Sequence, residues 1–493
     1  MMEEPVSPIP DQPGSGSRTR YGSLTNDLST RELRDVSQRA SSRRRNHVTM
    51  AVLCYINLIN YMERFTIAGV LLDIQKFFGI SDSTAALLQT VFLCSFLLLA
   101  PLFGYLGDRF NRKYIMLVGL SVWIATAAAG SFVTKSCFWF LILMRALVGI
   151  GEASYSTIAP TIISDLYTGA ERSAMICIFY IIMIVSSGLG YLVGAGSASL
   201  TGDWRWALRI TPILGSMGLV LLIFLCPNPP RGAAETHGKG IQEKTSYLED
   251  IKYLLKHKSY TSLSLGAITT SFNVGVLSFW MPTFLSRARV FQGLQPPCTR
   301  EPCSPTDSYI FGALTVVSGI LGGCLGYGLS RKLRDRVPNV DPLICGIGVL
   351  GACPCFFITI FVAPISIPTT CVFIFISEIL VSLNLTLMAD MVLYIVVPTR
   401  RASAEAFQIM LGHLLGDAIS PYIVGLISDT TVESDPESLA WSFHSLQYSL
   451  LISVFVAILG GIAYFLTAHY ITADRQAVLQ LAEDYSPLGQ DRK

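Results

Sequence analysis

Four charged residues lie inside long apolar stretches of the sequence, where charges are costly. Glu63 and Arg64 are adjacent in the first such stretch, and Arg145 and Glu152 are seven residues apart in the fourth. A charge at the centre of a bilayer costs about 3 kcal/mol on insertion scales, so such residues generally face a bundle interior or an aqueous cavity. Carboxylates and guanidinium groups placed there can exchange protons and bind charged substrates. We therefore expect two ion-pair sets, Glu63–Arg64 and Arg145–Glu152, at a transport site.

The composition requires many membrane-spanning helices around these charges. Of the 493 residues, 51% are hydrophobic and only 14% are charged, which excludes a soluble globular protein. A spanning helix needs about 20 mostly apolar residues. The sequence predicts an all-α membrane protein with twelve transmembrane helices, at 49–72, 84–107, 114–134, 138–165, 173–200, 207–226, 261–285, 308–330, 341–363, 367–397, 403–428 and 446–471.

The distribution of Lys and Arg predicts a multi-pass protein with both termini in the cytosol. In that orientation 27 of the 36 basic residues fall in cytosolic segments and only seven in the opposite loops. This asymmetry agrees with the positive-inside rule and with an even number of spans. Residues 1–48 are polar, rich in Ser, Pro and Arg, and lack the apolar core of a signal peptide. We interpret them as a disordered cytosolic tail.

A polar segment divides the spans into two pseudo-symmetric halves of six helices each. A weak internal repeat supports the division, because Gly190-Tyr-Leu-Val-Gly194 and Pro421-Tyr-Ile-Val-Gly425 occupy corresponding positions in the fifth and eleventh spans. A repeated plan of this kind predicts a central site between the halves and alternating access by rocking. The expected parts are the tail 1–48, the halves 49–226 and 261–471, the cytosolic linker 227–260 and the tail 472–493.

The turn after the second span carries a charged motif, Gly104-Tyr-Leu-Gly-Asp108-Arg109-Phe-Asn-Arg112-Lys113. Gly104 and Gly107 permit close helix packing, and Asp108 can accept hydrogen bonds from an arginine or a helix N-terminus. The motif resembles the signature loop of the major facilitator superfamily, with Asn111 where Gly is usual. That resemblance implies the major facilitator fold and a latch on the cytosolic side. The alternative is a basic turn that only sets topology.

Longer blocks resemble the spinster family of that superfamily, and the loop 293–298 is most similar to its third vertebrate group. The resemblance implies export of single-chain lipids with charged headgroups, namely sphingosine 1-phosphate and lysophospholipids. It further implies protons and membrane lipids as partners, no nucleic acid and a monomer. The blocks that carry the resemblance are 60–75, 145–160, 202–209 and 413–422.

The four buried charges gain specific roles from this resemblance. The family usually has Asp-Arg in the first span, whereas this chain has Glu63-Arg64. We expect Glu63 and Glu152 to accept protons, while Arg64 and Arg145 hold a phosphate headgroup by bidentate hydrogen bonds. One guanidinium cannot fully serve a carboxylate and a phosphate together, and this competition would couple the two. The alternative is a static ion-pair network that fixes helix register.

Several further residues are secondary candidates for the transport site. His413 and Asp417 are four residues apart and share a helix face, where they form either a proton-transfer pair or a structural hydrogen bond. Asn60 begins the first family block. Tyr155 either lines a slot for an acyl chain or simply packs. Glu378 and Asp390 are weaker candidates, and Asp390 is expected to lie near Arg400 or Arg401.

Two cysteines lie in a polar loop on the non-cytosolic side. Cys298 and Cys303 are expected to form a local disulfide, because that compartment permits oxidation. The sequence has no phosphate-binding glycine loop, nucleophile elbow or zinc-binding cluster. We therefore expect no enzyme activity, no cofactor and no metal.

Several alternatives stay open at this stage. The membrane is either endolysosomal or the plasma membrane. The substrate is either a lysolipid or a small organic anion, and transport is either proton-coupled or uniport. From a different class of function, the chain could be a non-transporting lipid sensor or scaffold that retains the fold.

Overall fold

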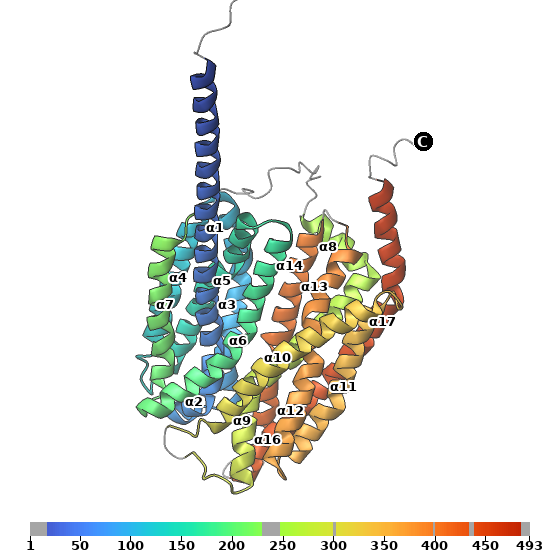
Figure 1. Cartoon of the computed structure of the whole chain (residues 1–493). Coiled ribbons are helices and arrows are strands. Elements are labelled where there is room, and N and C mark those ends of the chain that lie inside the picture. Colours follow the sequence, from blue (N-terminus) through green and yellow to red (C-terminus); the bar gives the residue numbers. More distant parts are fainter. Residues whose placement is uncertain (1–16, 229–246, 299–301, 398–399, 433–437, 485–493) are drawn as a thin grey trace, which may run out of the picture.

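The computed structural model describes residues 17–228, 247–298, 302–397, 400–432 and 438–484, and it forms two helical bundles side by side (Figure 1). The N-terminal half contains α1 (Ser17–Gly69), α2 (Leu71–Phe78), α3 (Asp82–Arg109), α4 (Arg112–Gly130), α5 (Phe138–Leu166), α6 (Gly169–Thr201) and α7 (Arg205–Leu225).

The C-terminal half repeats this arrangement with several interrupted helices. Its elements are α8 (Tyr247–Lys256), α9 (Lys258–Phe291), α10 (Thr306–Leu333), α11 (Val340–Val362), α12 (Ile367–Ser382), α13 (Asn384–Ile395), α14 (Arg401–Leu411), η2 (Gly412–Asp417), α15 (Ser420–Val432), α16 (Leu439–Ser449) and α17 (Leu451–Asp484).

These helices confirm the twelve spans predicted from the sequence to within a few residues. In the described part of the chain, 11 helical segments are long and apolar enough to cross a membrane. Helix α1 provides the twelfth and packs against α6 and α7. Three spans consist of consecutive elements: α12 with α13, α14 through η2 with α15, and α16 with α17.

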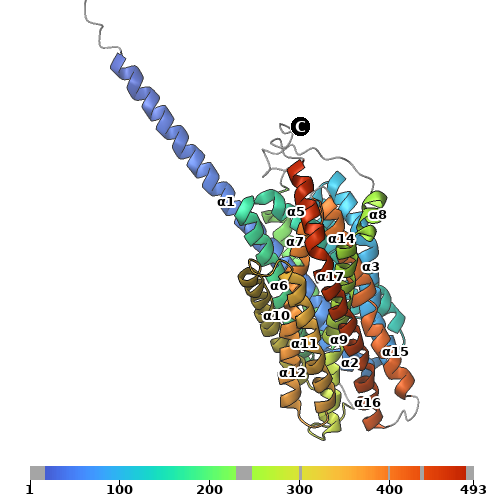
Figure 2. The same ribbon diagram turned by 90° about the vertical axis from the view of Figure 1, so that its right-hand side faces the viewer.

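Both described ends of the chain lie at one end of the bundle (Figures 1 and 2). We call this end, where Ser17 of α1 and Asp484 of α17 project, the terminal face. The opposite end, where the short helix α2 lies, is the distal face.

Helical structure extends into segments that the sequence analysis assigned to a disordered tail and to a polar linker. Helix α1 begins at Ser17, and Figure 2 shows it projecting beyond the bundle as one rod. No proline occurs between Pro13 and Pro101, so nothing interrupts the helix before it enters the bundle. Helix α8 occupies part of the linker, and α17 continues past residue 471. Residues 1–16 and 229–246 lie outside the described residues.

Each half has its own buried apolar core, and a third apolar cluster joins the halves near the distal face. This shared cluster includes Ile67 of α1, Trp280 of α9 and Val424 of α15. Helices α6 and α10 also meet across the halves at Gly188 and Gly312. A Cβ on Gly312 would lie 2.7 Å from the carbonyl oxygen of Gly188, so the backbones approach as closely as only glycine allows.

Candidate functional site

The central ion pairs link different residues from those that the sequence analysis paired. Arg145 of α5 donates a hydrogen bond to Glu63 of α1 at 2.5 Å, and both side chains are 2% exposed. Arg64 donates instead to Asp417 at the end of η2, so this pair joins the two halves. The expected Glu63–Arg64 pair does not form, because consecutive residues on a helix point in directions about 100° apart.

Glu152 lies at the same site without a cation bonded to it. Its carboxylate interacts electrostatically with Arg64, Glu63 and Arg145, yet its Oε2 atom is buried and has no hydrogen-bond partner among the described residues. The expected direct pair with Arg145 is thus replaced by the hydrogen-bonded pair that Arg145 forms with Glu63 of α1. An unpaired buried carboxylate is a candidate proton acceptor, since protonation removes its charge.

Phe92 of α3 lies beneath both guanidinium groups. The ring centroid is 4.8 Å from the guanidinium carbon of Arg145 and 5.9 Å from that of Arg64. An aromatic face attracts a cation more strongly when both are desolvated. Phe92 therefore holds the two cations close to one another. The sequence offered no signal for it, because a phenylalanine in a span is ordinarily a packing residue.

A π-helical turn positions the acidic partner of Arg64. The turn η2 runs from Gly412 to Asp417, and its end is closed by the N–H of Ala418, which donates to the carbonyl of His413. The Nδ1 atom of His413 lies 3.2 Å from Asp417 Oδ2, the same oxygen that accepts from Arg64. Such turns occur frequently at functional sites. His413 and Asp417 are therefore part of the central cluster.

The central cluster contains more hydrogen-bonding capacity than the protein itself satisfies. Buried side-chain polar atoms are almost always bonded, so a concentration of unbonded ones indicates a place for water or a ligand. Among the described residues on α1 and α5 at this cluster, the buried side-chain atoms without a partner are Asn60 Nδ2 and Oδ1, Glu63 Oε2, Arg64 Nε, Arg145 Nε and Nη2, and Glu152 Oε2.

Tyr155 has a packing role in this structure. Its hydroxyl donates to the carbonyl of Leu53, which fastens α5 to α1, and its side chain is 1% exposed.

Glu378 of α12 is bonded to hydroxyl groups of a neighbouring helix. Its carboxylate accepts hydrogen bonds from Thr315 at 3.1 Å and Ser318 at 2.6 Å, both on α10.

The gate motif at the terminal face makes some of the contacts expected of it. Arg112 pairs with Asp165 at the end of α5, and a Cβ on Gly107 would lie 3.3 Å from Ile158. Arg109 instead lies over the ring of Tyr105, 4.4 Å from its centroid. Asn111, where glycine is usual, caps α4 by accepting from the N–H of Lys113. The side chain of Asp108 lies outside the described residues.

One expectation about this face was wrong in detail. Gly104 was expected to permit close packing, but a Cβ there would meet nothing within 4 Å. Asp390 lies 3.6 Å from Arg334, a partner that was not expected from the sequence, and Arg334 also binds Asp341 at 2.8 Å. Arg334 follows α10 as Arg112 follows α3, so each half carries an ion pair at the equivalent turn. From the sequence, Arg400 and Arg401 were expected as partners of Asp390 because they are closest to it in the chain. Arg334 is distant in the chain, but its position corresponds to that of Arg112 in the other half.

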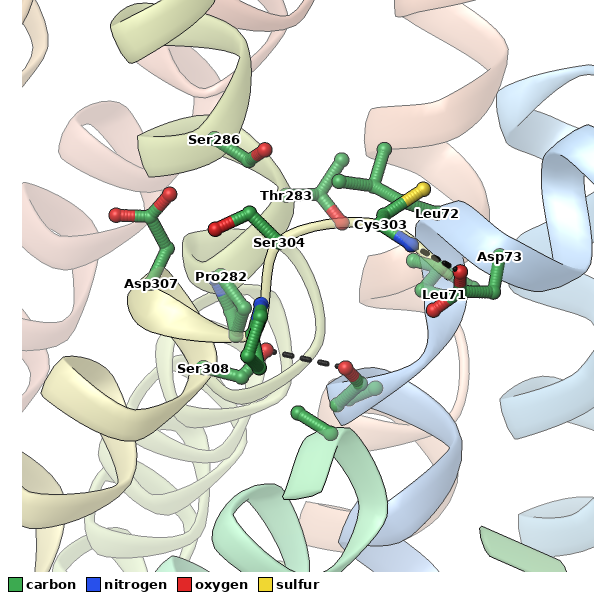
Figure 3. Close-up of a pocket in the computed structure, with 14 residues that line it drawn as sticks. Leu71, Leu72, Asp73, Pro282, Thr283, Ser286, Cys303, Ser304, Asp307 and Ser308 are labelled. Atoms are coloured by element: carbon green, nitrogen blue, oxygen red, sulfur yellow. Dashed lines mark hydrogen bonds between the residues drawn. The ribbon is translucent and has the colours of Figure 1, made fainter. Parts of the chain in front are cut away.

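Cys298 and Cys303 form a disulfide at the distal face. The N–H of Cys303 donates to Asp73 of α2 at 2.7 Å, across the halves, and Figure 3 shows the two residues facing one another at a small cavity. Nearby, the Ser308 hydroxyl donates to the carbonyl of Gly69. Burial raises the pKa of the Asp73 carboxyl to about 6, and the hydrogen bond from Cys303 offsets part of that rise.

Two six-helix halves with buried charges between them define a membrane transporter of the major facilitator type. Residues 53–363 match the model of the Major Facilitator Superfamily. A bacterial homolog of the human lysosomal transporter spinster, solved in an inward-facing and unoccupied conformation, has the same fold. Its TM-score is 0.78 at 21% identity, and the match covers 90% of this chain and 99% of that one.

Similar proteins narrow the assignment from the superfamily to one family within it. Protein spinster homolog 3 of Danio rerio is 57% identical over 478 residues, which cover 96% of this chain and 95% of the relative. Spinster homolog 1 of Rattus norvegicus is 50% identical, with 89% and 84% covered. Human spinster homolog 3 is 48% identical, with 88% and 86% covered. The chain belongs to the spinster family.

Proposed function

We propose that this transporter exports a single-chain lipid with a charged headgroup, sphingosine 1-phosphate or a lysophospholipid, by proton-linked alternating access. The observation that carries the proposal is the pair of buried guanidinium groups of Arg64 and Arg145 between the halves, both with unbonded N–H groups. A phosphate oxygen can accept several such hydrogen bonds at once. Membership of the spinster family supports a lipid as the substrate.

Headgroup binding competes with the two ion pairs. Arg145 already donates to Glu63 and Arg64 to Asp417, so a phosphate that takes over these donors weakens both contacts. Loss of the Arg64–Asp417 pair removes a link between the halves and favours their separation. Binding energy thereby drives the conformational change, since a ligand shifts an equilibrium only by its differential affinity for the two states.

Protons act on the carboxylates that the headgroup releases. Glu152 is buried without a bonded cation, and Glu63 becomes so once Arg145 turns to the substrate. A carboxylate left without its cation takes up a proton more readily. Proton binding and substrate binding then favour each other, which links the lipid flux to a proton gradient.

The orientation follows from the basic residues. Placing the terminal face in the cytosol puts most Lys and Arg on the cytosolic side, and the distal face then faces the lumen or the cell exterior. The solved bacterial protein is a homolog of human spinster, a lysosomal transporter. This supports an endolysosomal site for this chain, with the plasma membrane as the other candidate. We infer that a monomer is sufficient, because both halves of the site come from one chain.

The test is lipid release from cells that express the wild type, Arg145→Gln or the control Arg209→Gln. Arg209 is an arginine of α7 that contacts Ser131 and lies outside the site. Cells are loaded with labelled sphingosine 1-phosphate or lysophosphatidylcholine, and release is followed at acidic and neutral external pH with surface amounts matched.

We expect release of at least one lipid that Arg145→Gln abolishes and Arg209→Gln preserves. Release that equals that of untransfected cells for both lipids would contradict the lipid assignment. Flux of small organic anions would then be measured next, and its absence would favour a sensor or scaffold.

A further inference from the structure

A second charged cluster joins the halves at the distal face, away from the central site. Arg287 of α9 donates two hydrogen bonds to the carboxylate of Asp82 at the start of α3, at 2.5 and 2.8 Å. The two residues belong to different halves, and their side chains are 15% and 7% exposed. A bidentate arginine–carboxylate pair is among the stronger contacts between side chains.

Asp429 of α15 adds a helix cap that crosses between the halves. Its two carboxylate oxygens accept the backbone N–H groups of Asp82 and Ser83, each at 2.9 Å. These are the first N–H groups of α3, which have no partner within their own helix. The C-terminal half thus supplies the cap, and its negative charge lies at the positive end of the α3 dipole.

The cluster is saturated with hydrogen bonds, unlike the central site. Asp82 also accepts from Gln75 and from Ser428, both at 2.7 Å, and Arg287 also donates to the carbonyl of Ser442. A Cβ on Gly425 would lie 2.8 Å from the Asp82 carbonyl oxygen, so α15 and α3 touch here. A saturated, tightly packed contact holds surfaces together, whereas the unbonded groups at the centre leave capacity for a ligand.

We propose that Asp82, Arg287 and Asp429 form the distal gate, the contact that must break before substrate can pass through the distal face. The inference rests on alternating access in the proposed function. It adds the residues that hold one side shut and a route from those residues to the central site.

Helix α3 provides that route. Asp82 begins the helix, Thr90 donates to the carbonyl of Ala418 at 2.7 Å, and Phe92 lies against the guanidinium groups of Arg64 and Arg145. Asp82 and Phe92 are about 15 Å apart along α3, so this helix contacts both the gate and the centre. The pairs Arg287–Asp82 and Arg64–Asp417 each join the two halves, so separating the halves breaks both in a single movement, and loss of either pair weakens the other.

The test measures access to the space behind the gate. Ser278 of α9 lies between the gate and the central site, and its carbonyl accepts from the hydroxyl of Tyr191 of the other half. Ser278→Cys is introduced together with Cys137→Ser, which removes an exposed cysteine at the distal face. Intact cells are treated with a membrane-impermeant thiol reagent, and the labelling rate is measured on the surface population.

We expect Arg287→Gln and Asp82→Asn to raise the labelling rate about tenfold by shifting the population towards distal opening. Asp429→Asn has a smaller effect, because an amide keeps one of the two acceptor oxygens. The exchange Asp82→Arg with Arg287→Asp lowers the rate again towards that of the parent. Combining Arg287→Gln with Asp417→Asn raises the rate by less than the product of the two single effects, because both break one interface.

Arg289→Gln is the matched control. Arg289 is two residues from Arg287 on the same helix, but it points about 200° away around the helix axis and pairs with Asp307 at 2.6 Å within the C-terminal half. Its substitution leaves labelling unchanged. Unchanged labelling in Arg287→Gln and Asp429→Asn, at normal surface amounts, would overturn the gate, and so would equal increases in Arg287→Gln and Arg289→Gln.

This outcome is separable from the outcome for the proposed function. The labelling needs no substrate, so a response to Arg287→Gln supports the gate even where no lipid flux is found. The native Cys137 independently reports the orientation, because it reacts with the external reagent only when the distal face is outside the cytosol. Labelling of Cys137 without any response at Ser278→Cys, in variants with normal lipid flux, would remove the gate and leave the transport function standing.

Discussion

Arg64 is adjacent to Glu63 in the chain, yet its guanidinium binds Asp417, 353 residues further on and in the other half. Glu63 is bound instead by Arg145. The two ion pairs therefore have different roles in the fold. The Glu63–Arg145 pair lies within the N-terminal half, and the Arg64–Asp417 pair holds the two halves together.

The first prediction concerns the pair within the N-terminal half. Arg145→Gln leaves Glu63 as an unpaired charge and should lower stability by about 3–5 kcal/mol. The double variant Glu63→Gln with Arg145→Gln should recover part of that loss, because it buries no charge. The measurement is thermal unfolding in detergent. Arg43→Gln, which removes a pair with Glu171 exposed on the terminal face, is the control; an equal loss in both single variants would refute the argument.

The second prediction separates Glu152 from the paired carboxylates. Glu152→Gln removes no described hydrogen bond. The free energy of unfolding should therefore change by no more than a surface substitution would change it, within about 0.5 kcal/mol. Lipid flux should lose the part of its dependence on external pH that comes from Glu152, because the amide cannot take up a proton. A variant whose flux keeps the pH dependence of the wild type would exclude Glu152 as the proton acceptor.

The third prediction concerns pH at the distal face. The pKa of Asp73 is about 6 instead of the ordinary 3.8, because the carboxyl is buried. The contribution of Asp73 to the free energy of unfolding is therefore greatest below pH 4, where the carboxyl is neutral in any state. It falls as pH rises to about 6, by about 3 kcal/mol at most, because the carboxylate must then be charged while buried.

Asp73→Asn should remove this part of the pH dependence. Thermal unfolding of the wild type and of Asp73→Asn, compared between pH 4 and pH 7, measures it. Asp203→Asn, a half-exposed aspartate near the same face, should follow the wild type. Parallel profiles for wild type and Asp73→Asn would show that Asp73 is not the titrating group.

The fourth prediction concerns the glycine contact between α6 and α10. Gly312→Ala places a Cβ 2.7 Å from the carbonyl oxygen of Gly188, so the helices must separate, at a cost of about 1–3 kcal/mol. Gly323→Ala lies on the same helix with nothing within 4 Å and should be neutral. Thermal stability and lipid flux of the two variants are compared. Similar losses in both would contradict the argument, because Ala favours a helix more than Gly does and Gly323 has no close neighbour.

The lengths of the apolar stretches were sufficient to predict the twelve spans, because bilayer thickness fixes the length of a helix that crosses it. The buried charges were equally visible as exceptions inside apolar stretches. Their partners were not visible, since adjacency in the chain places Glu63 and Arg64 on different faces. Only the three-dimensional arrangement brings Asp417 to Arg64.

Other parts of the site had no distinctive sequence signal at all. Phe92 is one of 26 phenylalanines, and nothing in its surroundings marks it as the contact of two cations. Asp82 and Arg287 lie near span ends, where charges are expected for topology alone. Their pairing depends on contacts between the halves, which sequence periodicity within one helix does not encode.

The π-helical turn at Gly412–Asp417 has a consequence for the whole span that contains it. A π turn holds one residue more than an α-helical turn, so it rotates everything after it by about 100° about the helix axis. The faces that α14 and α15 present to their neighbours are therefore set out of phase by this extra residue. Deleting one residue within the turn would turn Asp429 away from the start of α3 while leaving every side chain of α15 unchanged. The backbone of this single turn, near the middle of the membrane, therefore sets the angle at which α15 presents Asp429 to the start of α3.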